Sequence, residues 1–143
     1  MTVRSILEKK GKDVVVIKPD DTLSRAIAIL AQHKIGALVV CDEAGHIKGI
    51  LSERDVVRAI ASMNAEIATH LVSEFMTSKV QVCHEYHTIN QVMEIMTHNR
   101  FRHMPVEENG KLAGIISIGD VVKRRIEDVE REAEEIRSYI ATA

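Results

Sequence analysis

The sequence has no tryptophan, only 3% aromatic residues in all, and a formal net charge of just −2 over 143 residues. Its core must therefore be aliphatic, and a hydrophobic fraction of 45% is ample for one domain or for two small halves that share a core. The weak negative charge argues against a nucleic-acid binder that depends on a basic surface. The sequence has no run of eighteen apolar residues and no signal-peptide pattern, so we expect a cytoplasmic protein that does not enter a membrane.

Metal-binding and catalytic patterns are also scarce. The two cysteines, Cys41 and Cys83, are far apart and form no Cys-x-x-Cys pair, which is typical of reduced thiols. Cys83 is close to His84 and His87, but no second ligand pair is spaced to complete a tetrahedral zinc site, so no metal is predicted. Dinucleotide, Walker A, zinc-protease and nucleophile-elbow motifs are missing, and no carboxylate cluster for Mg²⁺ is evident. We therefore expect no enzymatic activity.

One short motif, Gly-x-x-Ser-x-x-Asp, occurs twice, at residues 49–55 and 114–120. Each copy ends a β-branched apolar run and begins a segment of helical period, which is typical of a buried strand followed by a helix. The N–H groups of the first helical turn can bind a phosphate, the serine can donate to it, and the aspartate can accept from ribose hydroxyls. The same residues are equally suited to a capping box that only stabilises the helix. The residues concerned are Ser52, Asp55, Ser117 and Asp120.

The residues around the two motifs repeat as well. With a shift of 66 residues, Val14 to Val40 align with Val80 to Val106, and a shorter turn then reduces the shift to 65 at the motifs. Each copy has the pattern strand–helix–strand–turn–strand–helix, and a unit this small can bury its apolar face only against its twin. We therefore predict an α+β fold with mixed sheets, in which two βαββα units face each other in a pseudo-two-fold arrangement.

The pattern divides the chain into five parts. They are a lead-in helix (1–13), a first unit (14–62), a connector (63–78), a second unit (79–125) and a C-terminal helical extension (126–143). Helices are predicted to begin after Thr22 and after Thr88, where Gln91 would complete a capping box. The second unit is expected to begin with a strand at Val80 to Val82, as the first does at Val14 to Ile17.

The C-terminal helix carries apolar residues at alternating spacings of four and three. This heptad pattern favours packing against a partner helix, and we expect it to come from a second copy of the chain in a homodimer. The alternative is a single amphipathic helix that lies across its own domain. The residues of this seam are Val122, Ile126, Val129, Ala133, Ile136 and Ile140.

The repeat, its strand–helix order and the twin motifs together resemble a tandem pair of cystathionine-β-synthase-type (CBS) domains, a Bateman module of the stand-alone bacterial type. Met76-Thr77, Lys34 to Val40 and Arg102 to Val106 also fit, and the resemblance covers most of the chain. It implies a non-catalytic sensor that binds an adenosyl ligand between the two units and signals to an effector protein in trans. AMP or NAD(H) is the favoured ligand, with ADP, ATP or S-adenosylmethionine as further possibilities. The alternative is a structural dimerisation module without a physiological ligand.

The resemblance also implies the residues of the site. The two aspartates of the motifs would each hold a ribose, the two serines would donate to phosphate, and backbone groups of neighbouring segments would line the adenine slots. By this pattern the site residues are Val16, Ile35, Gly36, Ala37, Ser52, Asp55, Val80, Arg102, His103, Met104, Ser117 and Asp120.

Arg102 is the strongest candidate for a phosphate ligand, because its guanidinium fork matches phosphate oxygens. A surface salt bridge with Glu107 or Glu108 is the alternative. Its counterpart in the first unit is Gly36, so the two clefts should not be equivalent. The sequence leaves open which aspartate shares a cleft with Arg102, and Arg54 is a weaker further candidate for phosphate.

Overall fold

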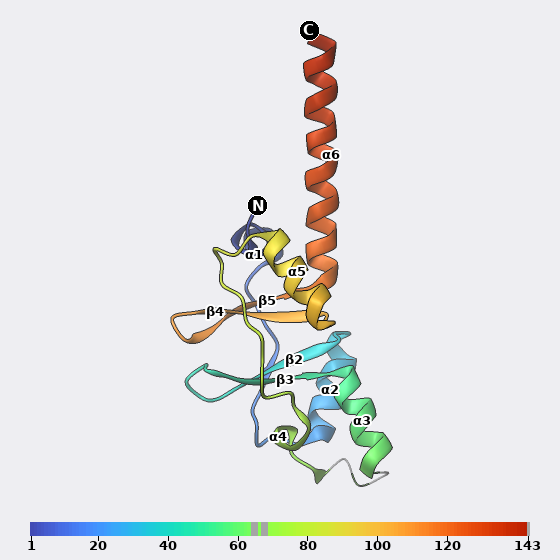
Figure 1. Cartoon of the computed structure of the whole chain (residues 1–143). Coiled ribbons are helices and arrows are strands. Elements are labelled where there is room, and N and C mark those ends of the chain that lie inside the picture. Colours follow the sequence, from blue (N-terminus) through green and yellow to red (C-terminus); the bar gives the residue numbers. More distant parts are fainter. Residues whose placement is uncertain (64–65, 67–68, 143) are drawn as a thin grey trace.

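The computed structural model describes residues 1–63, 66 and 69–142, and Figure 1 shows two α+β halves stacked on each other with a long helix projecting from the second. The fold class is the predicted one, α+β with short sheets and a long C-terminal helix. In chain order the elements are α1 (Val3–Lys10), β1 (Val16–Ile17), α2 (Leu23–His33), β2 (Ala37–Cys41), β3 (Ile47–Ser52), α3 (Glu53–Met63), α4 (Val72–Phe75), α5 (Ile89–Asn99), β4 (His103–Glu108), β5 (Lys111–Ser117) and α6 (Ile118–Thr142).

The first half is built on a mixed three-stranded sheet with the order β1-β2-β3. β1 is parallel to β2, and β3 is antiparallel to it. The central strand β2 is buried at all five positions, as its uninterrupted apolar run predicts. α2 begins after Thr22, whose side chain accepts a hydrogen bond from the backbone N–H of Arg25 at 3.2 Å. The core between α2 and the sheet contains Leu23, Ala26, Leu30, Leu38, Val40 and Leu51.

The second half contains a two-stranded sheet, the antiparallel pair β4–β5. The strand predicted at residues 80–82, all of which the structure describes, does not form, and Cys83 instead makes an isolated parallel bridge with Val106. The backbone N–H of Cys83 donates to the carbonyl of Pro105 at 3.0 Å. Extending this parallel ladder towards residue 81 would require an N–H from Pro105, which has none. The first half has Val39 at the equivalent position, and its ladder with β1 does form.

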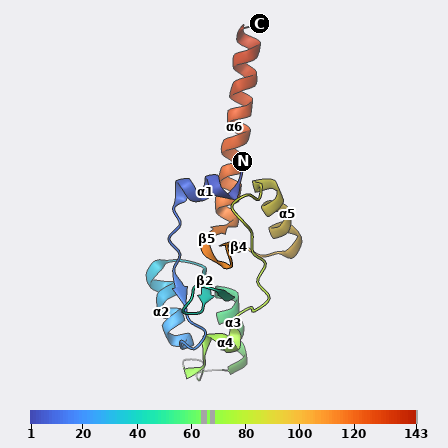
Figure 2. The same cartoon turned by 90° about the vertical axis from the view of Figure 1, so that its left-hand side faces the viewer.

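The two short helices that precede the repeats pack against the opposite halves. α1 packs on the second half, where Leu7 lies so close to Gly114 that a Cβ there would be 2.9 Å from Leu7 Cδ2. α4 packs on the first half through Val72, and the chain after it pairs with β3 through two backbone hydrogen bonds between Ile50 and Thr77, at 2.9 and 3.0 Å. Figure 2 shows α1 over the second half, next to the start of α6. The chain therefore runs from one half to the other between α1 and β1, and again between α4 and α5 (Figure 1).

α6 is anchored at its first turn and extends well beyond the folded body (Figure 1). Val121 is fully buried in the second core, whereas five of the six predicted seam residues are 45–67% exposed. The seam is thus available for a partner, and the identity of that partner stays a prediction. Among the described residues, no helix is long and apolar enough to cross a membrane.

Candidate functional site

Ser52 and Asp55 form a capping box at the start of α3. The backbone N–H and the hydroxyl of Ser52 donate to Asp55 Oδ2 at 2.9 and 3.1 Å, and Asp55 is 7% exposed. The other carboxylate oxygen, Oδ1, lies 3.5 Å from the hydroxyl of Thr77. Capping therefore uses one oxygen of Asp55 and leaves the other beside a weak, neutral partner. This carboxylate can stabilise the helix and still accept a hydrogen bond from a ligand.

Ser117 and Asp120 form the same box at the start of α6, with Ser117 N donating to Asp120 Oδ2 at 2.8 Å and Asp120 N to Ser117 Oγ at 3.1 Å. Here, however, the Lys10 ammonium also donates to Asp120 Oδ2 at 2.6 Å and to the carbonyl of Ile115 at 3.0 Å. Burial raises the pKa of Asp120, but the Lys10 ammonium and the Ser117 hydrogen bonds together outweigh it, so the pKa lies below its ordinary value. The two motif copies share a cap and differ in their electrostatic partner.

A cavity of about 380 Å³ opens beside Asp55, at the boundary between the halves. We call it the Asp55 cleft. Part of its wall is apolar and comes from Ile50, Val80 and Phe101, and the rest is polar or charged. Its remaining lining residues are Gly36, Ser52, Glu53, Arg54, Asp55, Thr77, Lys79, Gln81, Arg100, Arg102 and His103.

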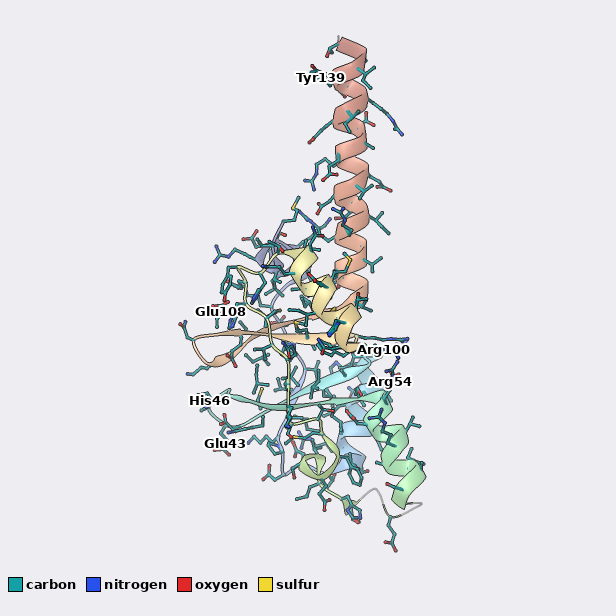
Figure 3. All side chains as sticks on the ribbon, in the orientation of Figure 1. Glu43, His46, Arg54, Arg100, Glu108 and Tyr139 are labelled. Carbon is teal, nitrogen blue, oxygen red and sulfur yellow. The ribbon has the colours of Figure 1, made fainter. Side chains whose placement is uncertain are left out.

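Cationic side chains dominate the charge of the Asp55 cleft. Figure 3 shows two of them, Arg54 and Arg100, on the same edge of the molecule, one from each half. Within the described part of the chain, none of the four cations of the cleft forms an ion pair with a carboxylate, so the predicted alternative of a salt bridge between Arg102 and Glu107 or Glu108 is not formed. The four are Arg54, Lys79, Arg100 and Arg102, and two carboxylates, Glu53 and Asp55, line the same cleft.

A second cavity, of about 310 Å³, lies beside the second motif, and we call it the Asp120 cleft. Lys10 lines this cavity but Asp120 does not, although the Lys10 ammonium donates to Asp120 Oδ2. Its lining residues are Lys10, Asp13, Val14, Val15, Ile35, Gly36, Ala37, His103, Ile115 and Ser117.

Gly36 and His103 line both cavities and form the wall between them. Burial lowers the pKa of His103, and the charge of Lys10 lowers it further, so the imidazole is neutral at pH 7. The shared wall therefore carries no charge. The four cations without an ion pair in the described chain line the Asp55 cleft, whereas the cation of the other cleft, Lys10, is paired with Asp120.

The structure divides the predicted site residues between the two clefts. Ser52, Asp55, Val80 and Arg102 line the first, Ile35, Ala37 and Ser117 line the second, and Gly36 and His103 line both. Three predicted residues line neither of these clefts: Val16, Met104 and Asp120. Met104 is fully buried in the second core, because successive residues of a strand point to opposite faces and His103 takes the cleft side.

Other site residues have no sequence motif that marks them. Lys79 and Arg100 lie in loop segments of the second unit, and only the fold brings their charges to one cleft. Lys10 could have been found from the sequence. The shift of 66 residues, extended upstream of Val14, aligns Lys10 with Met76 and Gly11 with Thr77, and Met76-Thr77 is a segment that the resemblance already singles out.

Comparison with known proteins agrees with this fold. The family described as the CBS domain matches residues 3–62 and 72–127. Both matched segments begin at or near the short helices α1 and α4, so each repeat includes its preceding helix. The chain is 36% identical over 111 residues to an uncharacterized 17.7 kDa protein of Acidianus ambivalens, covering 77% of this chain and 66% of that protein.

Solved structures of CBS-domain proteins superpose closely. The CBS-domain containing protein ATU1752 from Agrobacterium tumefaciens is 52% identical, with a TM-score of 0.84, over 87% of this chain and 99% of that one. The CBS domain pair of protein MJ0100, in complex with 5′-methylthioadenosine and S-adenosyl-L-methionine, is 25% identical, with a TM-score of 0.76, over 86% and 98% of the two chains.

Proposed function

Because this chain belongs to the CBS domain family, we propose that it is a regulatory module that binds an adenine nucleotide in the Asp55 cleft. One observation carries the proposal: a single cavity is lined by three kinds of group. They are a buried carboxylate with one oxygen outside the helix cap, an apolar wall, and four cations that form no ion pair within the described chain. These are the three chemistries that a ribose, an adenine and a phosphate chain require.

The size and polarity of the cleft support a nucleotide. A cavity of about 380 Å³ is within the usual range of small-molecule sites, roughly 300–1,000 Å³. Asp55 Oδ1 would accept from the ribose hydroxyls, and the adenine would lie against Val80 and Phe101. The phosphates would then reach Arg102 and Arg54, the latter in the first turn of α3, where the helix dipole also favours an anion.

The charges favour a phosphorylated ligand over a sulfonium. MJ0100 binds S-adenosyl-L-methionine and 5′-methylthioadenosine, which share the adenosyl group with AMP, ATP and NAD(H). Four cations against two carboxylates would repel a positively charged sulfonium and attract one or more phosphates. We therefore rank AMP, ADP, ATP and NAD(H) ahead of S-adenosylmethionine for this cleft.

The proposed output is a change in how two halves or two subunits are arranged. A ligand that bridges both halves at the Asp55 cleft would favour one arrangement, and such coupling requires the ligand to prefer one state over the other. We further infer a homodimer through the exposed seam of α6 and an effector protein that reads the arrangement in trans.

Thermal denaturation with AMP, ATP, NADH and S-adenosylmethionine tests the proposal. A ligand at one hundred times its Kd should stabilise the protein by about 2.7 kcal/mol. Asp55→Asn should abolish the shift, whereas Asp120→Asn, the matched substitution in the second motif, should leave it intact. A wild-type protein that shifts with none of the four compounds would contradict the proposal and favour a structural dimerisation module.

A further inference from the structure

The charged residues beside the seam of α6 follow the same heptad as the seam. In the pattern abcdefg, residues 126, 133 and 140 take position a, and residues 122, 129 and 136 take position d. The e and g positions flank such a seam, and their charges set the partner and the orientation of a coiled coil. All six e and g residues of α6 are exposed, and five of them are charged. Position e is Lys123, Glu130 and Arg137, and position g is Arg125, Glu132 and Tyr139.

Two copies of α6 in a parallel, in-register pair would bring opposite charges together. In this arrangement each g residue faces the next e residue of the other helix. Arg125 then faces Glu130 of the second copy, and Glu132 faces Arg137 of the second copy. The two-fold symmetry of the pair makes each contact occur twice. The parallel arrangement therefore has complementary charges on both sides of the seam.

An antiparallel pair of the same helices would bring like charges together. Full overlap of the seam would place Val122 beside Ile140 of the second copy, so that e faces e and g faces g. Glu130 and Glu132 would each lie opposite their own counterpart, and Lys123 would lie opposite Arg137 of the second copy. Because like charges across an interface are unfavourable, the pattern favours the parallel pair.

Contacts within the single chain leave these charges available. Of Arg125, Glu130, Glu132 and Arg137, only Arg137 forms an ion pair among the described residues, at 3.6 Å from Glu134. Both side chains of this pair are more than 70% exposed, so it contributes little and Arg137 can turn to a second helix. Figure 3 shows the projecting part of α6, with Tyr139, clear of the folded body.

The face of α6 that packs on the folded body is a different one. Val121 and Asp128 are the buried residues of this helix, and both occupy position c, outside the seam and its e and g flanks. The attachment of α6 to its own half therefore leaves the seam uncovered.

We propose that α6 binds the α6 of a second copy in parallel and in register. The inference rests on the homodimer of the proposed function and specifies its geometry, but it requires no nucleotide. α6 starts at the folded body and projects from it, so parallel pairing places both bodies at the same end of the helix pair (Figure 1). An antiparallel pair would hold them at opposite ends of a rod about 35 Å long, since α6 has 25 residues and a helix rises about 1.5 Å per residue. The parallel pair makes the two bodies neighbours, as a change in subunit arrangement requires.

Cysteine cross-linking tests the orientation. Ile140→Cys places a thiol near the far end of the seam, where parallel helices bring the two copies of residue 140 together. Oxidation with copper–phenanthroline should convert most of this variant into a disulfide-linked dimer on a non-reducing gel. Ser138→Cys, at position f on the outer face of the same helix, is the matched control and should remain mostly uncross-linked. The native Cys41 and Cys83 are buried, so the wild type should not cross-link.

A charge exchange tests the register. Glu132→Arg should raise the dimer Kd about threefold or more, because it places an arginine opposite Arg137 of the second copy. Glu132→Arg/Arg137→Glu should restore the wild-type Kd, because the exchange reverses the pair and keeps it complementary. Glu135→Arg makes the same change of charge at position c and should leave the Kd unchanged. Sedimentation equilibrium measures all four proteins.

Three results would overturn the parallel pair. They are equal cross-linking of Ile140→Cys and Ser138→Cys, cross-linking of Ile140→Cys only when Val122→Cys protein is mixed with it, and a charge exchange that does not restore the Kd. Ile140 is 67% exposed, so its replacement should not disturb the folded body. The outcomes are separate from those of the nucleotide site. A parallel dimer that binds no nucleotide would contradict only that site, and a monomer or an antiparallel dimer would contradict only this pairing.

Discussion

The imidazole of His103 lies over Gly36, so that a methyl group added at Gly36 would be 3.2 Å from His103 Cε1. This contact is the wall between the two clefts, and it exists because the repeats differ at matching positions. Arg102 and His103 stand in the second repeat where Gly36 and Ala37 stand in the first. Because Gly36 has no side chain, it leaves room for His103, which lies in the matching segment of the second repeat.

Gly36→Ala should destabilise the protein by about 1 kcal/mol, at the low end of overpacking costs, because the imidazole must move by a few tenths of an ångström. In a His103→Ala background the same substitution should cost close to nothing. Urea denaturation of the wild type, both single variants and the double variant gives the coupling energy. Equal costs in the two backgrounds would mean that the contact does not limit the size of residue 36.

The architecture follows from the sequence because its signals are local and are repeated. The helix starts at Thr22 and Thr88 depend on one side-chain cap each, and both caps form as predicted. The missing strand at residues 80–82 shows the limit of the repeat argument. Pro105 is compatible with the apolar pattern of β4 but withholds the one N–H that a parallel neighbour needs.

The site was less predictable than the fold. The resemblance names the motif residues, but which cleft receives Arg102 depends on how two distant segments meet. Lys10 illustrates the reason: it lies 110 residues from Asp120 in sequence, and only the packing of α1 on the second half brings the two together. Charges that converge through tertiary packing leave no periodic trace in the sequence.

Arg102→Met should weaken ATP binding by about tenfold or more, because a charged hydrogen bond contributes about 1.5–3 kcal/mol. Adenosine, which has no phosphate, should lose little affinity. Arg25→Met, which removes an exposed arginine from α2 outside the cleft, is the control. Isothermal titration calorimetry with both ligands measures the effect. Equal losses for ATP and adenosine would show that Arg102 does not contact the phosphates.

The glycines that begin the two motifs should differ in their tolerance of alanine. At Gly49, a Cβ would meet the backbone carbonyl of Thr77 at 2.8 Å and Met76 Sδ at 2.7 Å, whereas at Gly114 its three nearest atoms would all belong to the side chain of Leu7. We expect Gly49→Ala to cost about 2–3 kcal/mol and Gly114→Ala about 1 kcal/mol, since a side chain can shift more readily than a paired backbone. Thermal and urea denaturation compare the two, and a larger cost at Gly114 would contradict this assignment.

Stability should depend on pH through Asp120. The pKa of this carboxyl is lowered in the folded protein, so its contribution is present above its unfolded pKa of about 3.9 and is lost as the pH falls through the folded value. Lys10→Met removes the ammonium while the burial that raises the pKa stays. Its stability deficit relative to the wild type should be largest at pH 7 and should shrink between about pH 5 and pH 2.

Denaturation at several pH values gives this difference directly. Other carboxyls with lowered pKa values, such as Glu85, titrate in both proteins and cancel in the comparison. Lys9→Met, whose lysine lies 3.4 Å from Glu127, serves as the control and should show a small deficit at every pH. A Lys10→Met deficit that stays constant down to pH 2 would rule out the ion pair as its cause.

The exposed seam of α6 should mediate self-association. Ile136 and Ile140 are 60% and 67% exposed in the single chain, so replacing both with lysine should not change the stability of the folded body. In a helix pair, however, the two lysines would place like charges in a buried apolar seam, which is strongly unfavourable. Light scattering coupled to size-exclusion chromatography should therefore report a dimer for the wild type and a smaller particle for Ile136→Lys/Ile140→Lys.

The control variant adds the same charge to the same helix away from the seam. Ser138→Lys/Ala141→Lys changes two exposed positions outside the heptad pattern and should leave the dimer intact. If both variants stay dimeric, the subunits meet elsewhere, and the exposed Val57 and Ile60 of α3 become the next surface to test. If the wild type itself is monomeric, homodimerisation through the seam is wrong. The heptad pattern would then need a helix from a different protein to cover it.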